Sequence, residues 1–106
     1  MEKEPFIFQD LGEEAERIGF VNRVVPHDEL LPFVREYATE LAENCSPASM
    51  AVMKRQVYEQ LHARLGPAEK EAVALMLESF SRPDFREGVQ SFLEKRTPRF
   101  ARLGEK

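Results

Sequence analysis

The sequence predicts a mainly α-helical fold of four to five helices with one short strand near the N-terminus. Three observations support this class. Apolar residues recur at helical spacing along most of the chain, start and stop residues bracket each periodic segment, and only residues 20–25 combine strand-forming residues with a proline stop. A chain of 106 residues has the length of one domain with one modest core.

The first 14 residues are an N-terminal segment for which the sequence predicts no definite structure. Residues 5–8 (PFIF) place three apolar side chains together, a pattern that fits either a strand or a docking segment, and both interpretations stay open. Asp10 is a candidate N-cap for a short helix that continues to about Arg17, and Gly19 is its expected C-terminal stop.

Residues 20–25 (FVNRVV) are rich in β-branched and aromatic residues and end at Pro26, which predicts a short strand. An isolated strand has no sheet to join, so its backbone N–H and C=O groups would lack partners. We therefore expect this strand either to lie exposed or to pair with a segment outside these 106 residues, as in a piece of a larger fold.

Two helices are predicted after the strand. Asp28 is expected to cap a helix over residues 29–44, because apolar residues recur there at three- and four-residue steps. Ser46-Pro47 repeats the start signal and predicts a second helix over residues 47–64.

Two further helices follow. Pro67 is expected to open a helix with an apolar face so wide that it needs cover on more than one side. That face comprises Ala72, Val73, Leu75, Met76, Leu77 and Phe80. The last helix begins in the cap region 81–84 and ends before Thr97-Pro98, and residues 101–106 form a tail.

Charge and composition argue against several functional classes. The formal net charge is −4, but residues 82–106 carry seven Lys/Arg and four Asp/Glu, so this segment is +3 and the remainder −7. A pI of 5.3 argues against a nucleic-acid-binding domain and leaves room only for a local anion site. Residues 1–10 lack the pattern of a signal peptide, and no apolar run approaches the roughly 18 residues of a membrane span.

The residues that most often carry chemistry form no convincing site. His27, Asp28 and Glu29 are adjacent, but adjacent side chains do not converge, and Asp28 already has a capping role. His62 stands alone, and the chain has neither an H-x-x-x-H nor a C-x-x-C spacing, so no metal site is predicted. The single Cys45 excludes an internal disulfide framework and favours a cytoplasmic setting.

Two continuous segments, AERIGFVNRVVPHDEL (15–30) and DFREGVQSFLEKRTPRF (84–100), resemble motifs of the enoyl-coenzyme A hydratase/isomerase, or crotonase, family. The first is similar to the passage in which a helix ends at a Gly before a strand of the form G-h-V-N-x-V-h-P. The second is similar to the family's ending, D-x-x-E-G-h-x-x-F-h-x-K-R-x-P-x-F. Ser46-Pro47 with Lys54 seven positions after the Pro matches the helix between them. The resemblance implies that residues 15–100 correspond to the C-terminal helical region of the crotonase fold.

The resemblance also implies roles for two residues. A Lys at the position of Lys95 reaches the adenosine phosphate region of coenzyme A, often in a neighbouring subunit, whereas a Lys-Arg pair at a helix end is otherwise most simply a solvated one. Met76 occupies a position that is often aromatic and packs near the adenine, so a stacking contact is replaced here by a flexible thioether. Coenzyme A thioesters would be ligands of the assembled enzyme, with no tightly bound cofactor.

In the family, the oxyanion-hole peptides and the usual catalytic acids lie upstream of the matched region. The five glycines of this chain are never adjacent and offer no Gly-rich loop in their place. The resemblance therefore implies a segment of a lyase or isomerase of fatty acid metabolism that closes the coenzyme A site and builds the trimer interface, with no catalysis by the isolated chain. The partners would be further copies or the remainder of a crotonase core. The alternative is a self-sufficient, non-catalytic helical module that binds coenzyme A or docks on a protein.

Overall fold

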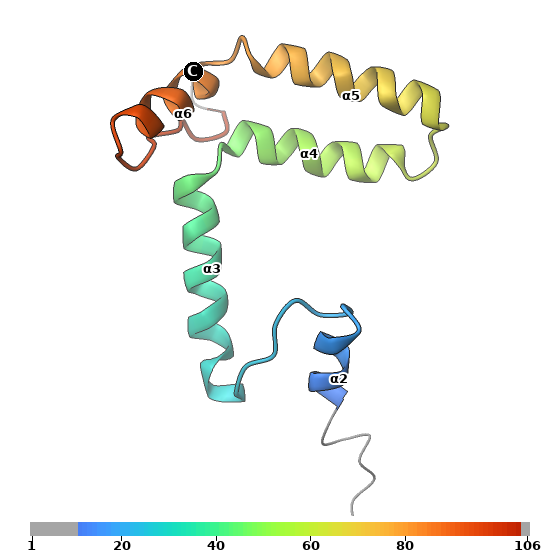
Figure 1. Ribbon diagram of the computed structural model, residues 1–106, viewed down its shortest axis with the longest axis vertical. Helices are drawn as coiled ribbons and strands as arrows, with labels where there is room; N and C mark the ends of the chain where they lie inside the picture. The colour runs from blue at the N-terminus through green and yellow to red at the C-terminus, as the bar shows by residue number, and fades with distance from the viewer. Residues whose placement is uncertain (1–10, 105–106) are drawn as a thin grey trace, which may run out of the picture. The chain divides into compact units, whose positions relative to one another are not determined.

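The computed structural model describes residues 11–104 (Figure 1). Its elements follow in the order α2 (Leu11–Arg17), the 3-10 turn η1 (His27–Glu29), α3 (Leu30–Asn44), α4 (Pro47–Gln60), α5 (Leu65–Ser79) and α6 (Pro83–Leu93). The chain divides into two compact units at residues 36 and 37, and α3 crosses this boundary. The mainly helical fold is confirmed. The apolar segment 5–8 and the proposed cap Asp10 lie outside the described residues.

Helix α2 ends as the sequence predicts, at a glycine. Gly19 has a φ of +78°, the left-handed conformation that glycine adopts without the Cβ penalty. The Phe20 N–H donates to the Ala15 carbonyl at 2.8 Å and the Gly19 N–H to the Glu16 carbonyl at 3.0 Å. These two bonds form a Schellman motif, which supplies partners for carbonyls at the helix end.

The predicted strand over residues 20–25 is wrong for the part of the chain that the structure describes. These residues form bends and irregular backbone instead. The Val24 N–H donates to the Glu16 carboxylate at 3.1 Å, and a methyl group added at Gly12 would lie 3.3 Å from Val24 Cγ1. The segment therefore folds back along α2. Strand-forming side chains do not make a strand without a neighbouring strand to complete the hydrogen bonds.

Helix α3 begins one residue later than predicted. Asp28 lies inside η1, where the Glu29 N–H donates to the Pro26 carbonyl at 2.9 Å, and no side-chain cap is present at this turn. The tighter 3-10 turn supplies the first hydrogen bond of the helical segment, so the expected capping by Asp28 is replaced by a backbone bond.

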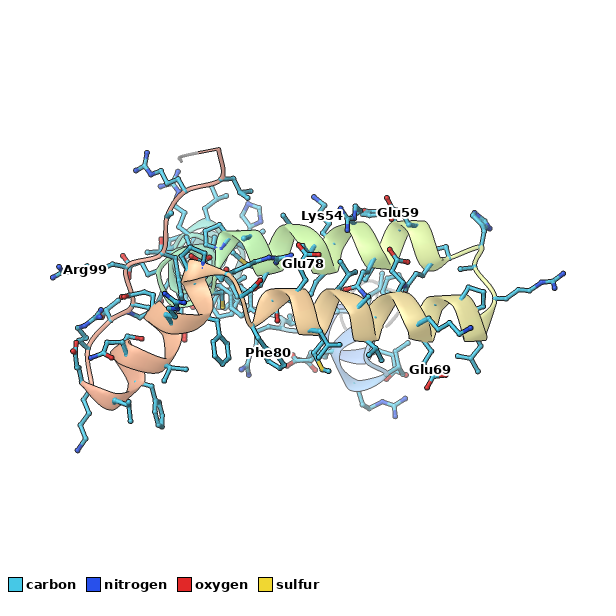
Figure 2. The ribbon with its side chains drawn as sticks, turned by 90° about the horizontal axis from the view of Figure 1, so that it is seen from above. Lys54, Glu59, Glu69, Glu78, Phe80 and Arg99 are labelled. Atoms are coloured by element: carbon cyan, nitrogen blue, oxygen red, sulfur yellow. The ribbon has the colours of Figure 1, made fainter. Side chains whose placement is uncertain are left out.

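Helices α4 and α5 run antiparallel and side by side (Figures 1 and 2). Beyond the first turn of α4, the less exposed residues of both helices recur at steps of three and four, so each helix presents one narrow stripe to the other. The stripes are Ser49, Val52, Gln56 and Gln60 on α4, and Ala68, Glu71, Leu75 and Ser79 on α5. Small and polar side chains dominate both stripes, and the larger apolar side chains of the pair are directed elsewhere.

The turn between α4 and α5 explains two shifted helix boundaries. The Gln60 side-chain amide donates to the Ala68 carbonyl at 3.4 Å and to Glu71 Oε2 at 3.2 Å, which ties the end of α4 to the first turns of α5. The chain therefore reverses after Gln60, four residues before the predicted end. Helix α5 begins at Leu65 rather than Pro67, because a proline is tolerated in the first turn, where the N–H needs no helical partner.

Helix α6 is joined to both neighbouring helices. Ser46, the N-cap of α4, accepts a hydrogen bond from the Ser49 N–H at 3.2 Å and donates its own proton to Asp84 in the first turn of α6. The Phe80 and Phe85 rings form an edge-to-face pair with centroids 5.2 Å apart. Figure 2 shows Phe80 at the end of α5 next to the start of α6.

Among the described residues, no large hydrophobic side chain is fully buried. Within residues 11–104 only Ser91 is buried, with an exposed fraction of 4%. The hydrophobic residues predicted to form a core are therefore present at helical spacing, but the helices described here leave them open to solvent.

Candidate functional site

The turn that ends α6 carries Lys95, the residue that the sequence singles out. Its φ is +53°, a left-handed conformation that is uncommon for a residue with a side chain. The Lys95 N–H donates to the Phe92 carbonyl at 3.3 Å and the Arg96 N–H to the Ser91 carbonyl at 3.0 Å. This is the same Schellman motif that ends α2, but with lysine at the position where glycine is usual.

Local stability does not explain a lysine at this position. The left-handed conformation costs a residue with a Cβ roughly 1–2 kcal/mol. A positive charge near the C-terminal end of an exposed helix returns about 0.3–1 kcal/mol through the helix dipole. The cost exceeds the return, so glycine would make the more stable turn. The Lys95 side chain is exposed and forms no ion pair with the residues the structure describes.

A carboxylate on α6 fastens the chain just after Lys95. Glu87 accepts two hydrogen bonds from the Arg96 guanidinium, at 2.5 and 3.2 Å, and one from the Arg99 N–H at 2.9 Å. Arg96 also donates to Glu94 at 2.5 Å. We call Glu87, Glu94, Arg96 and the Arg99 N–H the Glu87 clasp. The two-pronged pairing of a guanidinium with a carboxylate fixes direction as well as distance.

The clasp sets the ionisation of its members. The hydrogen bonds from the Arg96 side chain and then from the Arg99 N–H lower the pKa of Glu87 to about 2. Gln90 and then Arg96 lower the pKa of Glu94, and the two carboxylates raise the pKa of Arg96. Glu87 is therefore ionised and already bonded at neutral pH, which makes it a structural anion and a poor proton acceptor.

The tail after the clasp returns over α6. A methyl group added at Gly88 would lie 4.0 Å from Cζ of Phe100, so the Phe100 ring covers this glycine. Ser91, one turn later, donates its hydroxyl proton to the Gly88 carbonyl at 2.9 Å while its own carbonyl accepts the Arg96 N–H. Four residues of the closing motif therefore contribute to one structure, the end of α6 and the tail that returns over it: Glu87, Gly88, Arg96 and Phe100.

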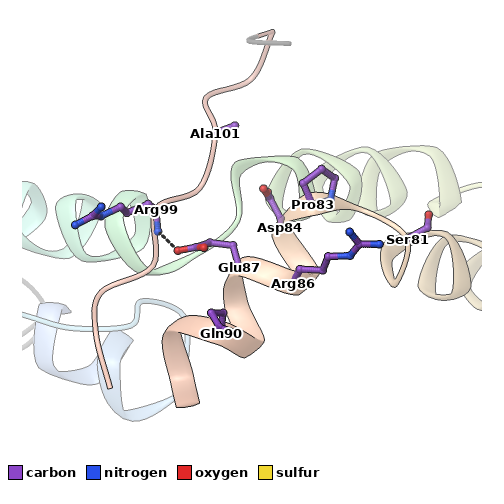
Figure 3. A pocket seen from close by; sticks show the side chains of 8 residues that line it. All are labelled: Ser81, Pro83, Asp84, Arg86, Glu87, Gln90, Arg99 and Ala101. Carbon is purple, nitrogen blue, oxygen red and sulfur yellow. Dashed lines mark hydrogen bonds between the residues drawn. The ribbon is translucent and has the colours of Figure 1, made fainter. Parts of the chain in front are cut away.

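A groove beside the clasp is not arranged to hold a phosphate. It is lined by Ser81, Pro83, Asp84, Arg86, Glu87, Gln90, Arg99 and Ala101. Figure 3 shows that the Arg86 side chain extends toward Ser81 and the Arg99 side chain points away from Glu87, so the two cations do not converge. Two carboxylates, Asp84 and Glu87, line the same groove and offset the charge of its two arginines. The net positive charge of residues 82–106 therefore creates no anion site in this groove.

Met76 lies on α5 and lines a second groove, between α4 and α5. Its side chain is half-exposed, and the other lining residues are Ser49, Val52, Met53, Gln56, Ala72, Leu75, Ser79 and Arg82. Lys95 is not among them. The structure therefore places the two candidate coenzyme A contacts on different elements, Met76 on α5 and Lys95 in the turn after α6.

In the described part of the chain, the fold brings the remaining candidate residues into no common site. Cys45 is a free, partly exposed thiol at the end of α3, and His27 lies in η1. Within residues 11–104, no three His, Cys, Asp or Glu side chains gather closely enough to hold a metal ion. No helix in the same range is long and apolar enough to cross a membrane.

Wide apolar faces stay open on the last two helices. Leu77 on α5 is 58% exposed and Phe92 on α6 is 82% exposed. Their neighbours on these faces, Val73, Met76, Phe80, Phe85, Val89 and Leu93, are also open to solvent. A third groove, on α6, is almost wholly apolar; its lining residues are Asp84, Phe85, Gly88, Val89, Phe92 and Leu93. Such contiguous patches are typical of protein interaction surfaces.

Inspection of the sequence missed the Glu87 clasp and the bond between Ser46 and Asp84. Each joins residues too far apart in sequence to share a helix turn, nine positions for Glu87 and Arg96 and 38 for Ser46 and Asp84. The only local signal was the Lys95-Arg96 pair at a helix end, which is most simply explained as solvated.

Comparisons with known proteins agree with the sequence motifs. The profile of the enoyl-CoA hydratase/isomerase family matches residues 9–103. The chain is 39% identical over 88 residues to a probable enoyl-CoA hydratase of Mycobacterium bovis, covering 82% of this chain and 34% of that protein. It is 38% identical over 93 residues to the mevalonyl-coenzyme A hydratase of Aspergillus fumigatus, covering 82% of this chain and 33% of that protein.

The solved structures give the same result. A probable enoyl-CoA hydratase/isomerase from Mycobacterium abscessus matches with a TM-score of 0.78 at 26% identity, covering 84% of this chain and 35% of that one. The chain spans about a third of the length of the relatives it matches. Because the profile covers nearly all of the sequence, the chain belongs to the enoyl-CoA hydratase/isomerase family.

Proposed function

We propose that the chain supplies the C-terminal helical layer of an enzyme that acts on acyl-coenzyme A thioesters. In this proposal the helices cover a coenzyme A site and build contacts between subunits, trimer-like as the family resemblance implies. The observation that carries the proposal is the pair of open apolar faces on α5 and α6, next to an absence of buried hydrophobic residues in the described range.

The energy available in these faces supports an association role. Burying one large apolar side chain contributes about 1.5–3 kcal/mol. The eight side chains named above on α5 and α6 are about half exposed or more. Covering the remaining half of each would contribute about 6–12 kcal/mol in all, which is comparable with the whole net stability of a typical domain. The described helices do not bury these side chains against one another. A partner surface, either the remainder of a crotonase core or further copies of the chain, would bury them.

Coenzyme A contact is the second part of the proposal. Lys95 would hold a phosphate through its ammonium, and Met76 would pack against the adenine region. The exposed Lys95 side chain and the half-exposed Met76 beside an apolar groove support this assignment. The names of the relatives, an enoyl-CoA hydratase and a mevalonyl-coenzyme A hydratase, support an acyl-coenzyme A ligand.

These 106 residues would not catalyse hydration by themselves. The reaction needs donors that polarise the thioester carbonyl and acids that move protons at the α and β carbons, and the motifs that supply them in the family lie outside the matched third. The structure offers Glu87 and Glu94 near the candidate site, but both are engaged in the clasp with lowered pKa values. We also propose that the protein is cytoplasmic, on the basis of its single cysteine, Cys45.

Size-exclusion chromatography with light scattering tests the association role. The purified chain is expected to self-associate, and a well-folded monomer over a wide concentration range would contradict the proposal. Hydration of crotonyl-coenzyme A by the chain alone would contradict the catalytic part. A monomer that binds coenzyme A without catalysis would support the alternative, a self-sufficient coenzyme A-binding module.

A further inference from the structure

We propose that Glu87 and Arg96 are positioning residues that hold Lys95 in its left-handed turn and thereby direct its ammonium toward a phosphate of coenzyme A. This inference deepens the proposed function and rests on it. It goes further because it names the residues through which Lys95 would act. Glu87 and Arg96 are bonded to each other, so their proposed role is to position Lys95 and not to bind the ligand.

The first argument is the placement of the clasp. Glu87 is eight residues before Lys95 on α6, yet its carboxylate bonds the chain after Lys95 at two points, the Arg96 side chain and the Arg99 N–H. Glu94 holds Arg96 from the residue just before Lys95. Lys95 is therefore the apex of a turn that is fastened on both sides.

The second argument is the conformation of Lys95. A residue with a side chain persists at a φ of +53° only where its surroundings over-determine the backbone. The Schellman bonds from Lys95 and Arg96 and the three bonds to Glu87 together do so. A lysine kept where glycine is more stable points to a role for the side chain itself.

The third argument is the distribution of charge at this turn. The Arg96 guanidinium is two-thirds covered and is occupied by Glu87 and Glu94. The Lys95 ammonium is exposed, and among residues 11–104 no carboxylate pairs with it. The clasp therefore occupies the Arg96 guanidinium and leaves the three N–H donors of the Lys95 ammonium free for an anionic ligand. A compact ammonium on a fixed backbone suits a phosphate oxygen.

A double-mutant cycle on the 106-residue chain tests the inference. Four proteins are compared in coenzyme A titrations at low and high salt: wild type, Glu87→Gln, Lys95→Ala and the double variant. Glu69→Gln is the matched control, since it removes the same charge from the far end of α5 (Figure 2), away from the clasp. Amide hydrogen exchange at Arg99 reports whether the clasp is closed.

We expect Lys95→Ala and Glu87→Gln each to weaken coenzyme A binding about fivefold, the effect of one surface charge contact. Each should also reduce the salt dependence of binding. The double variant should bind no more weakly than Lys95→Ala, because Glu87 acts through Lys95. Glu69→Gln should bind as wild type does. Exchange at Arg99 should accelerate in Glu87→Gln and stay unchanged in Lys95→Ala.

The contrary outcomes are distinct. Equal and additive losses would show that Glu87 acts elsewhere, and wild-type binding by Glu87→Gln with weakened binding by Lys95→Ala would overturn the positioning role alone. No effect of Lys95→Ala, or no binding by the wild type, would overturn the phosphate contact of the proposed function as well. If Glu87→Gln fails to fold, Arg96→Lys keeps the charge and removes the two-pronged pairing, and the same cycle applies to it.

Discussion

Lys95 shows at the scale of one residue how the chain departs from its most stable local structure. The turn after α6 has the hydrogen bonds of a glycine turn and a φ of +53°, but a lysine occupies the position. The Glu87 clasp holds that backbone in place. The strain and the clasp are therefore two parts of one arrangement, and each can be tested separately.

Replacing Lys95 with glycine should stabilise the chain. Glycine adopts a positive φ without the steric cost, so Lys95→Gly is expected to raise the free energy of unfolding by roughly 1 kcal/mol. Thermal unfolding followed by circular dichroism measures the change, with Lys95→Ala as the control that keeps the Cβ. A lower melting temperature for Lys95→Gly than for Lys95→Ala would show that the turn is not strained.

The clasp should open on acidification. The pKa of Glu87 in the folded chain is about 2, below the ordinary value of 4.5, so the unfolded chain binds the proton more tightly. The stabilisation is therefore fully present above about pH 4.5 and is lost as the pH falls toward 2. Hydrogen exchange at the Arg99 amide, followed from pH 6 downward, should show this loss. Glu87→Gln should show fast exchange throughout, and a wild-type transition centred near pH 4.5 would contradict the lowered pKa.

At the scale of helices, the junction of α4 with α6 depends on one hydroxyl. Ser46 caps α4 by accepting the Ser49 N–H and at the same time donates to Asp84 in the first turn of α6. One side chain thus begins one helix and fastens the start of another, 38 residues later. The stripes between α4 and α5 are mostly small or polar, so this bond to α6 adds a second tertiary contact to the start of α4.

Three substitutions separate the two roles of Ser46. Ser46→Ala should destabilise the chain by about 1 kcal/mol through the lost cap, and more through the lost bond to Asp84. Ser46→Asp keeps a good cap but places a second carboxylate against Asp84, so it should also destabilise. Adding Asp84→Asn should restore much of the stability of Ser46→Asp. Urea unfolding measures all three, and a Ser46→Asp variant as stable as wild type would show that the bond between α4 and α6 is unimportant.

At the scale of the whole molecule, the open faces of α5 and α6 are the main feature. Hydrophobic residues sit at the helical spacing of a core, yet the described part of the chain buries none of the large ones. In the proposed function, other segments of the enzyme or other copies of the chain would cover these faces.

A charge placed on the open face of α5 should reduce association. Leu77→Lys is expected to shift the chain toward monomer, because the ammonium would be desolvated in any apolar interface. Ala74→Lys, which also introduces a lysine on α5 but on the side that carries Lys70 and Glu78, should leave association unchanged. Light scattering over a range of concentrations distinguishes the two. Equal behaviour of both variants would place the interface elsewhere.

The sequence alone determined the helices and the family. Caps, prolines, glycines and apolar spacing act over a few residues, so the helix order, the glycine end of α2 and the proline start of α4 could all be predicted. The motifs at residues 15–30 and 84–100 identified the family for the same reason, since each is a continuous stretch.

Tertiary structure alone decided the rest. Residues 20–25 have the composition of a strand, but a strand depends on a neighbouring strand, and without one they fold back along α2. The early end of α4 depends on bonds from Gln60 to α5. The clasp around Lys95 depends on a carboxylate two helical turns earlier that meets the chain only after α6 has ended. Such bonds join residues that no local pattern relates, and they exist only when the chain is folded.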